Sequence, residues 1–180
     1  MRKYARLLLA AALVSLNLAA LPQAASARQT ITVSTTDSII QGHDKAIVTA
    51  DHSSYNPDTA RYTLRGNVMI QFGSRTFRTD TAKISTKTLQ LWTENNTQLM
   101  EGDLHFTGGA VYADLQANVA WFFGPNCSLE RPGLAIHSDN MVYNWCTRIA
   151  SFDGHVLCIQ KGEQRTAGHM EYDLDTGKIR

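Results

Sequence analysis

The chain has 180 residues, of which 43% are hydrophobic, and 17 Lys and Arg against 16 Asp and Glu give a formal net charge of +1. This length is enough for one domain with a sizeable core. A charge so close to zero argues against a general binder of nucleic acids or membrane surfaces, and we expect no nucleic-acid partner.

Residues 1–27 have the features of a cleaved signal peptide. Basic residues come first, an apolar run follows over residues 7–21, and the small residues Ala25-Ser26-Ala27 precede Arg28. As a helix the run would span roughly 22 Å, short of the ~30 Å hydrocarbon core of a bilayer. The sequence therefore predicts export and cleavage before Arg28, with an uncleaved membrane anchor as the alternative. Cleavage leaves 14 Lys and Arg against 16 Asp and Glu, a net charge of −2.

The mature chain divides into a polar segment, residues 28–45, and a domain, residues 46–180. We interpret the polar segment as flexible or as a sheet edge. Between Arg61 and Phe72 apolar and polar residues alternate, which predicts a half-buried strand of about 12 residues. Gly66 interrupts its apolar side and predicts a bend. The apolar side comprises Tyr62, Leu64, Val68, Ile70 and Phe72.

Residues 55–68 are repeated at 143–156, with an offset of 88 throughout. The repeat places Phe152 and Val156 at the positions of Leu64 and Val68, and a finer repeat of 29 residues links Tyr55 to Ile84 and Tyr143 to Tyr172. Turn residues punctuate the chain, and no segment of the mature chain has a helical period. The pattern predicts an all-β stack of about five strand–turn–strand layers. Expected turns include Asn56–Thr59, Thr107–Gly109 and Gly124–Asn126.

Several of these residues also occur in a known family. The segments Ala50-Asp51, Tyr55-Asn56-Pro57-Asp58-Thr59, Leu64-Arg65-Gly66-Asn67-Val68 and Arg78-Thr79-Asp80-Thr81-Ala82 resemble the organic-solvent-tolerance-like (LptA-like) domain of lipopolysaccharide transport. The likeness is good over about residues 46–85, fair over 134–180 and loose between them. It implies a folded-over antiparallel β-sheet, often called a β-jellyroll, whose groove carries lipopolysaccharide acyl chains across the periplasm. It also implies stacking end to end through edge strands.

We therefore expect a periplasmic carrier that is not an enzyme and needs no cofactor, with lipopolysaccharide or a similar amphiphile as ligand. Transport proteins, or further copies of the chain arranged head to tail, are the expected edge-strand partners. Candidate groove residues are Tyr62, Leu64, Val68, Ile70, Phe72, Phe152 and Val156. Two alternatives stay open: a membrane-tethered LptC-like partner, and a closed-core β-solenoid with a structural or polysaccharide-binding role.

Basic residues concentrate between Arg61 and Lys87, against the single acid Asp80. Such a cluster is ordinarily a solvated face. As an alternative, arginines there would pair with the phosphates of lipid A. The candidates for that contact are Arg61, Arg65, Arg75 and Arg78.

Three cysteines in an exported chain allow one disulfide. Cys146 and Cys158 are expected at opposite ends of a strand, too far apart to be joined. Cys127 follows the expected turn at Gly124–Asn126, on the same end as a turn that Cys158 precedes, so we predict a Cys127–Cys158 bond. That all three stay reduced remains an alternative. The histidines are scattered and no cysteines have zinc-ligand spacing, so we expect no metal site.

Overall fold

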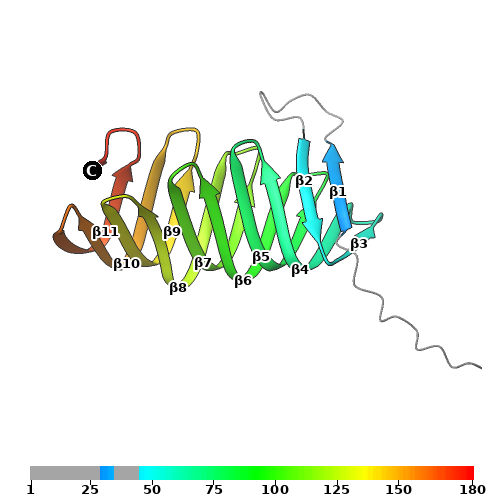
Figure 1. Ribbon diagram of the computed structural model, residues 1–180, viewed down its shortest axis with the longest axis horizontal. Coiled ribbons are helices and arrows are strands. Elements are labelled where there is room, and N and C mark those ends of the chain that lie inside the picture. Colours follow the sequence, from blue (N-terminus) through cyan, green and yellow to red (C-terminus); the bar gives the residue numbers. More distant parts are fainter. Residues whose placement is uncertain (1–28, 35–44) are drawn as a thin grey trace, which may run out of the picture.

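The computed structural model describes residues 29–34 and 45–180, and the expected signal peptide lies outside the described residues. They form one 12-stranded antiparallel sheet. Figure 1 shows the strands following one another along the long axis, from β1 at one end to β11 at the other. The strands are β1 (Gln29–Ser34), β2 (Lys45–Ala50), β3 (His52–Asn56), β4 (Arg61–Phe72), β5 (Arg75–Ser85), β6 (Gln90–Glu101), β7 (Leu104–Asp114), β8 (Val119–Arg131), β9 (Leu134–Asn144), β10 (Ile149–Gln160), β11 (Glu163–Asp173) and β12 (Lys178–Ile179).

Each long strand bends near its middle, so the sheet folds over and faces itself. In β4 the pairing with β5 shifts register between Arg65 and Val68, where Gly66 and Asn67 have positive φ angles of 74° and 46°. An extra residue of this kind is a β-bulge, which bends the strand that carries it. Gly154 and His155 make the same bend in β10, with φ angles of 77° and 44°. The predicted bend at both glycines is thus confirmed.

The bend also explains two turns that sequence reasoning placed wrongly. Gly108 and Gly109 lie inside β7, and Gly124 to Asn126 lie inside β8. Gly124 and Asn126 have φ angles of 101° and 75°, and pairing with β9 resumes at Cys127. Glycine and asparagine favour positive φ angles, which occur in turns and in bulges alike. Here they form bulges, because the hydrogen-bond ladder continues beyond them.

Two sets of turns join the strands. Long turns cover residues 57–60, 86–89, 115–118, 145–148 and 174–177, and short turns cover residues 73–74, 102–103, 132–133 and 161–162. We call the half of each strand next to a long turn the long-turn limb and the other half the short-turn limb. Because the sheet is folded over, the long turns and the short turns face each other across a mouth.

The long turns repeat the same chemistry in every layer. A side-chain oxygen at the end of the preceding strand accepts backbone N–H bonds from the turn, as Asn56 does from Asp58 and Thr59 at 2.9 and 3.2 Å. The corresponding acceptors, 29 or 30 residues apart, are Ser85, Asp114, Asn144 and Asp173. Successive turns are also joined by backbone bonds, from Thr86 to Ala60, Leu115 to Leu89, Trp145 to Asn118 and Leu174 to Arg148. These bonds confirm the predicted stack of layers.

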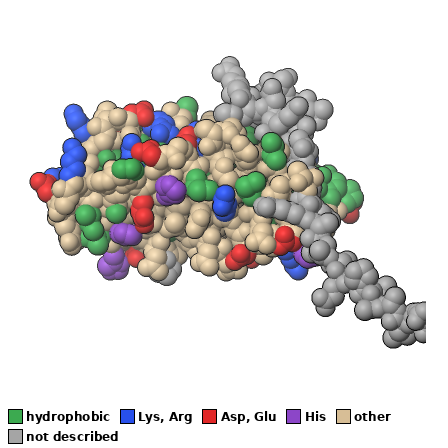
Figure 2. Space-filling model, in the orientation of Figure 1, with side chains coloured by type: hydrophobic (Ala, Val, Ile, Leu, Met, Phe, Trp, Pro, Cys, Tyr) green, Lys and Arg blue, Asp and Glu red, His purple; other side chains and the backbone are tan. Residues whose placement is uncertain are grey.

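The inward side chains form one continuous apolar core, which runs from Val48 in β2 to Leu174 beyond β11. On the outer face shown in Figure 2, hydrophobic side chains are scattered in small groups among polar ones. The predicted all-β folded-over sheet is confirmed. Within the described part of the chain there is no helix that is long and apolar enough to span a bilayer.

Candidate functional site

The seven candidate groove residues all face the interior of the folded sheet. Leu64 and Phe152 are fully buried, and Phe72, the most accessible of the six buried members, is 4% exposed. Tyr62 is partly buried and packs against the same core. The candidates from β4 and β10 therefore share one interior, although these strands are separated by five others in the sheet.

Polar side chains join the two sides of the mouth, a line of contacts that we call the seam. Glu101, at the short-turn end of β6, accepts a hydrogen bond from the guanidinium of Arg75 on the same side, at 2.8 Å. From the long-turn side, the same carboxylate accepts hydrogen bonds from Arg148 at 2.8 Å and from the hydroxyl of Tyr143 at 2.6 Å. The Arg75 guanidinium also lies 5.1 Å from the ring centre of Trp145, a cation–π contact across the mouth.

The seam continues toward the C-terminal end of the stack. Arg131, at the end of β8, donates to the backbone carbonyl of Leu174 at 3.1 Å. Gln160, at the end of β10, donates to the hydroxyl of Tyr172 and to the carbonyl of Gly177, both at 3.1 Å. The seam thus joins the short-turn ends of β5, β6, β8 and β10 to the long-turn side between residues 143 and 177.

The ion pair at the seam is largely removed from water. The side chains of Arg75 and Glu101 are 9% and 11% exposed, and the Arg75 Nε atom is buried without a hydrogen-bond partner. Burial raises the pKa of Tyr143 well above its ordinary value, and its hydrogen bond to Glu101 adds to the shift. Tyr143 therefore stays neutral and donates to the carboxylate of Glu101.

The four candidate phosphate-binding arginines are not brought together. Arg75 faces the interior and is held at the seam, whereas Arg61 and Arg65 lie on the outer face of the long-turn limb. Arg78 lines a different cavity on the short-turn limb. Side chains alternate along β5, so Arg75 and Arg78, three residues apart, lie on opposite faces. A single phosphate site made of all four is excluded by this arrangement.

The predicted Cys127–Cys158 disulfide is wrong, since all three cysteines are free. Strand β9 lies between the two: Cys127 pairs with Ser138 of β9, and Cys158 pairs with Ile136 on its other side. Two strand spacings are about 10 Å, beyond the ~7 Å that a disulfide allows between Cα atoms. Gly124–Asn126 was read as a turn, and this error placed Cys127 at the end of the stack.

Sequence reasoning gave no functional role to Glu101, Tyr143, Arg148, Arg131 or Gln160. These seam residues are far apart in the chain, as with the 47 positions between Glu101 and Arg148. One signal was available: Glu101, Arg131 and Gln160 each directly precede a short turn, at the position where the apolar alternation predicts an inward side chain. A polar residue there implies a partner across the mouth.

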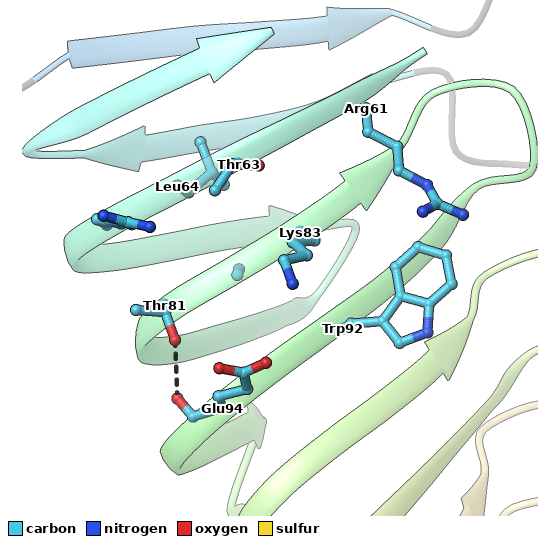
Figure 3. A pocket seen from close by; sticks show the side chains of 9 residues that line it. Arg61, Thr63, Leu64, Thr81, Lys83, Trp92 and Glu94 are labelled. Carbon is cyan, nitrogen blue, oxygen red and sulfur yellow. Dashed lines mark hydrogen bonds between the residues drawn. The ribbon is translucent and has the colours of Figure 1, made fainter. Parts of the chain in front are cut away.

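An outer cavity of ≈ 400 Å³ lies over the long-turn limbs of β4, β5 and β6. Figure 3 shows Arg61 beside the ring of Trp92, with Lys83 between Trp92 and Glu94. Across residues 29–34 and 45–180, no group of three or more His, Cys, Asp or Glu is placed to hold a metal ion.

Comparison with known proteins gives a match over most of the chain. The family model for the LptA/(LptD N-terminal domain) LPS transport protein covers residues 47–178. One similar solved structure is that of LptH, described as the LptA-homologous periplasmic component of the lipopolysaccharide transport device of Pseudomonas aeruginosa. It is 14% identical, with 75% of this chain and 80% of that chain covered and a TM-score of 0.33. A search of curated proteins gave no match.

Proposed function

Since this chain belongs to the LptA/LptD N-terminal domain family of lipopolysaccharide transport proteins, we propose that it is a periplasmic carrier that shields lipopolysaccharide acyl chains inside its folded sheet. The residues proposed to contact the chains are the interior candidates of β4 and β10: Tyr62, Leu64, Val68, Ile70, Phe72, Phe152 and Val156.

The observation that carries this proposal is the continuity of the apolar interior. Buried apolar side chains from β2 to the turn after β11 form one cluster. Each acyl methylene buried against such a surface contributes about 0.8 kcal/mol. Several long chains would therefore bind tightly without any chemical step, and a carrier with this interior needs no catalytic residue.

Loading requires the two limbs to separate at the mouth, because the interior side chains pack on one another. The seam is the part of the structure that resists this separation. Its contacts are hydrogen bonds and ion pairs, which water can replace when the limbs part. The apolar contacts at the bends need not break, because each strand is continuous there. We propose that acyl chains enter through the mouth, with the bends acting as hinges.

The ends of the sheet suggest how the carrier meets its partners. Within the described ranges, β11 pairs with β12 only at Tyr172 and Asp173, so most of that side of β11 presents an edge. From Glu163 to His169 its side chains are exposed or only partly buried. Strand β1 lies at the opposite end of the sheet. Unpaired strand edges add further strands readily, so we propose head-to-tail pairing with other copies or with transport partners.

Site-specific photo-cross-linking tests the interior site. A benzophenone amino acid at Phe152, inside the sheet, is expected to cross-link to lipopolysaccharide in the exported protein. The same group at Ile159, exposed on the outer face of β10, is the matched control and should give little product. No cross-linking at Phe152 in a variant that circular dichroism shows to be folded would favour a closed core and overturn the proposal. Equal cross-linking at both positions would show contact without an interior site and would overturn it as well.

A further inference from the structure

We propose a second ligand site, on the outer face of the long-turn limbs, that binds the phosphorylated sugar part of lipopolysaccharide. The site is separate from the interior, and the choice of ligand rests on the proposed function. Its floor is a row of aromatic side chains and one wall is a group of cations. Neither feature is needed for acyl-chain binding.

The aromatic row follows from the strand register. Trp92 of β6 lies directly opposite Tyr112 of β7, which lies opposite Trp121 of β8. The ring centres are 5.6 Å apart for Trp92 and Tyr112 and 5.2 Å apart for Tyr112 and Trp121. All three point outward and are partly exposed. Phe123, two residues beyond Trp121 on the same face, is 46% exposed. The limb therefore presents a row of overlapping aromatic rings, which we call the aromatic strip, to solvent.

Cations gather at the β4 end of this strip, around the ≈ 400 Å³ cavity. Lys83 is the cross-strand neighbour of Trp92, and the guanidinium of Arg61 lies 5.1 Å from the centre of its ring. Arg65 also lines the cavity, and Glu94 supplies its one carboxylate. Among the residues that the structure describes, Arg61, Arg65 and Lys83 form no ion pair. Their charges are available to a ligand.

Together these groups match a phosphorylated sugar. One face of a pyranose ring presents mostly C–H groups, which pack on the negative face of an aromatic ring. A phosphate on the sugar would be held by Arg and Lys donors, with bidentate pairing at an arginine. A neutral sugar would leave three cations and one carboxylate unmatched. A free phosphate would leave the aromatic strip uncovered.

The position of the cavity favours the head of the transported amphiphile as the occupant. Arg61 directly follows the long turn at residues 57–60, and the long turns form one lip of the mouth. Trp92 lies two residues inside the strand from the next long turn, at 86–89. A head group that emerges from the mouth while its acyl chains stay inside would reach this outer face by crossing a single row of turns.

Calorimetric titration with fully deacylated lipopolysaccharide tests the site without involving the interior. The probe keeps the sugars and their phosphates and has no acyl chains. We expect wild-type protein to bind it, and Trp92→Ala and the double variant Arg65→Gln/Lys83→Gln each to weaken binding about tenfold. Lys161→Gln removes a lysine from a short turn and serves as the matched control, with affinity within about twofold of wild type.

Three outcomes would overturn the proposal: no binding of the deacylated probe, equal binding after its phosphates are removed, or binding of inorganic phosphate as tight as that of the probe. Unchanged affinity in the Trp92 and Arg65/Lys83 variants would overturn it as well. Cross-linking of intact lipopolysaccharide from Phe152 is measured in the same variants. If the protein with the cross-linker at Phe152 and no other change gives no product, the interior carrier function is wrong. If it gives the product but the deacylated probe does not bind, only the outer site is wrong.

Discussion

Glu101 and Arg148 are 47 residues apart in the chain, and the Nη1 atom of Arg148 lies 2.8 Å from the Oε2 atom of Glu101, across the mouth of the folded sheet. The other carboxylate oxygen of Glu101 accepts from Arg75 at 2.8 Å. One carboxylate thus pairs with two guanidinium groups, one from each side of the mouth, and Arg148 also pairs with Asp175 at 3.3 Å. Without Glu101, Arg75 would lose the ion pair that the structure gives it.

Glu101→Gln is therefore expected to destabilise the protein strongly. Breaking a buried ion pair by removing one partner costs about 3–5 kcal/mol, since Arg75 is left charged and unpaired. Glu163→Gln is the matched control, because its pair with Arg165 is exposed and contributes less than about 1 kcal/mol. Urea unfolding gives both free energies. Similar losses for the two variants would show that the seam does not hold the limbs together.

Gly66→Ala is expected to destabilise the fold more than Gly102→Ala. Both glycines have positive φ, at 74° and 59°, so an L-residue at either costs about 1–2 kcal/mol. At Gly102 a new Cβ meets nothing within 4 Å, whereas at Gly66 it would lie 2.5 Å from the Oδ2 atom of Asp51.

The excess cost at Gly66 is measured as the difference in free energy of unfolding between the two variants. In an Asp51→Ala background most of this difference should disappear, because two of the three closest atoms are gone. Equal costs at Gly66 and Gly102 in the wild-type background would indicate that the close approach at the bend has no energetic role.

Native protein is expected to react with iodoacetamide at Cys146 alone. Cys146 is exposed, whereas Cys127 and Cys158 are buried. Burial, with the negative charge of Asp139 adding to it, raises the pKa of the Cys127 thiol to about 11, and burial also raises the pKa of Cys158. Mass spectrometry should find one adduct at pH 8 and three after denaturation without reductant. A single adduct after denaturation would mean that Cys127 and Cys158 are joined by a disulfide.

Tyr143 should make the fold lose stability at alkaline pH. Its pKa in the folded state is raised above the ordinary value of 10.0, chiefly by burial. Above pH 10 the unfolded chain loses this proton while the folded chain keeps it, so the free energy of unfolding falls as pH rises, by up to about 1.4 kcal/mol per pH unit. In Tyr143→Phe the slope between pH 10 and 11 should be shallower. An unchanged slope would contradict the assignment.

Local patterns predicted the strands and the layers well. From Arg61 to Phe72 the even-numbered residues point inward on both sides of the bend. This is possible because β4 has one more residue than β5 at the bulge. The equivalent glycines, Gly66 and Gly154, were read correctly as bends because the flanking strand patterns continued on both sides of them. The layers were visible in the sequence because their units recur at 29 residues, as from Tyr55 to Ile84 and from Tyr143 to Tyr172.

The errors arose where one residue type serves two structures. Gly124 and Asn126 favour positive φ in a turn and in a bulge alike, so only the hydrogen-bond ladder distinguishes the two. This ambiguity misplaced Cys127. Arg75 was assigned to a basic surface, although it faces inward. The polar residues that precede the short turns could have indicated one side of the seam, but their partners depend on how the two limbs meet, which no local pattern encodes.

The repeating long turn has a further consequence for how such proteins change length. Apart from the seam, each layer contacts the layers on either side, and the same backbone bond joins each pair of successive turns. Stability of this kind is nearly additive along one dimension. Inserting or deleting one unit of about 29 residues would lengthen or shorten the interior by two strand spacings, roughly 10 Å. The cross-section of the interior would stay the same, so the length of the passage and the chemistry of its wall can evolve independently.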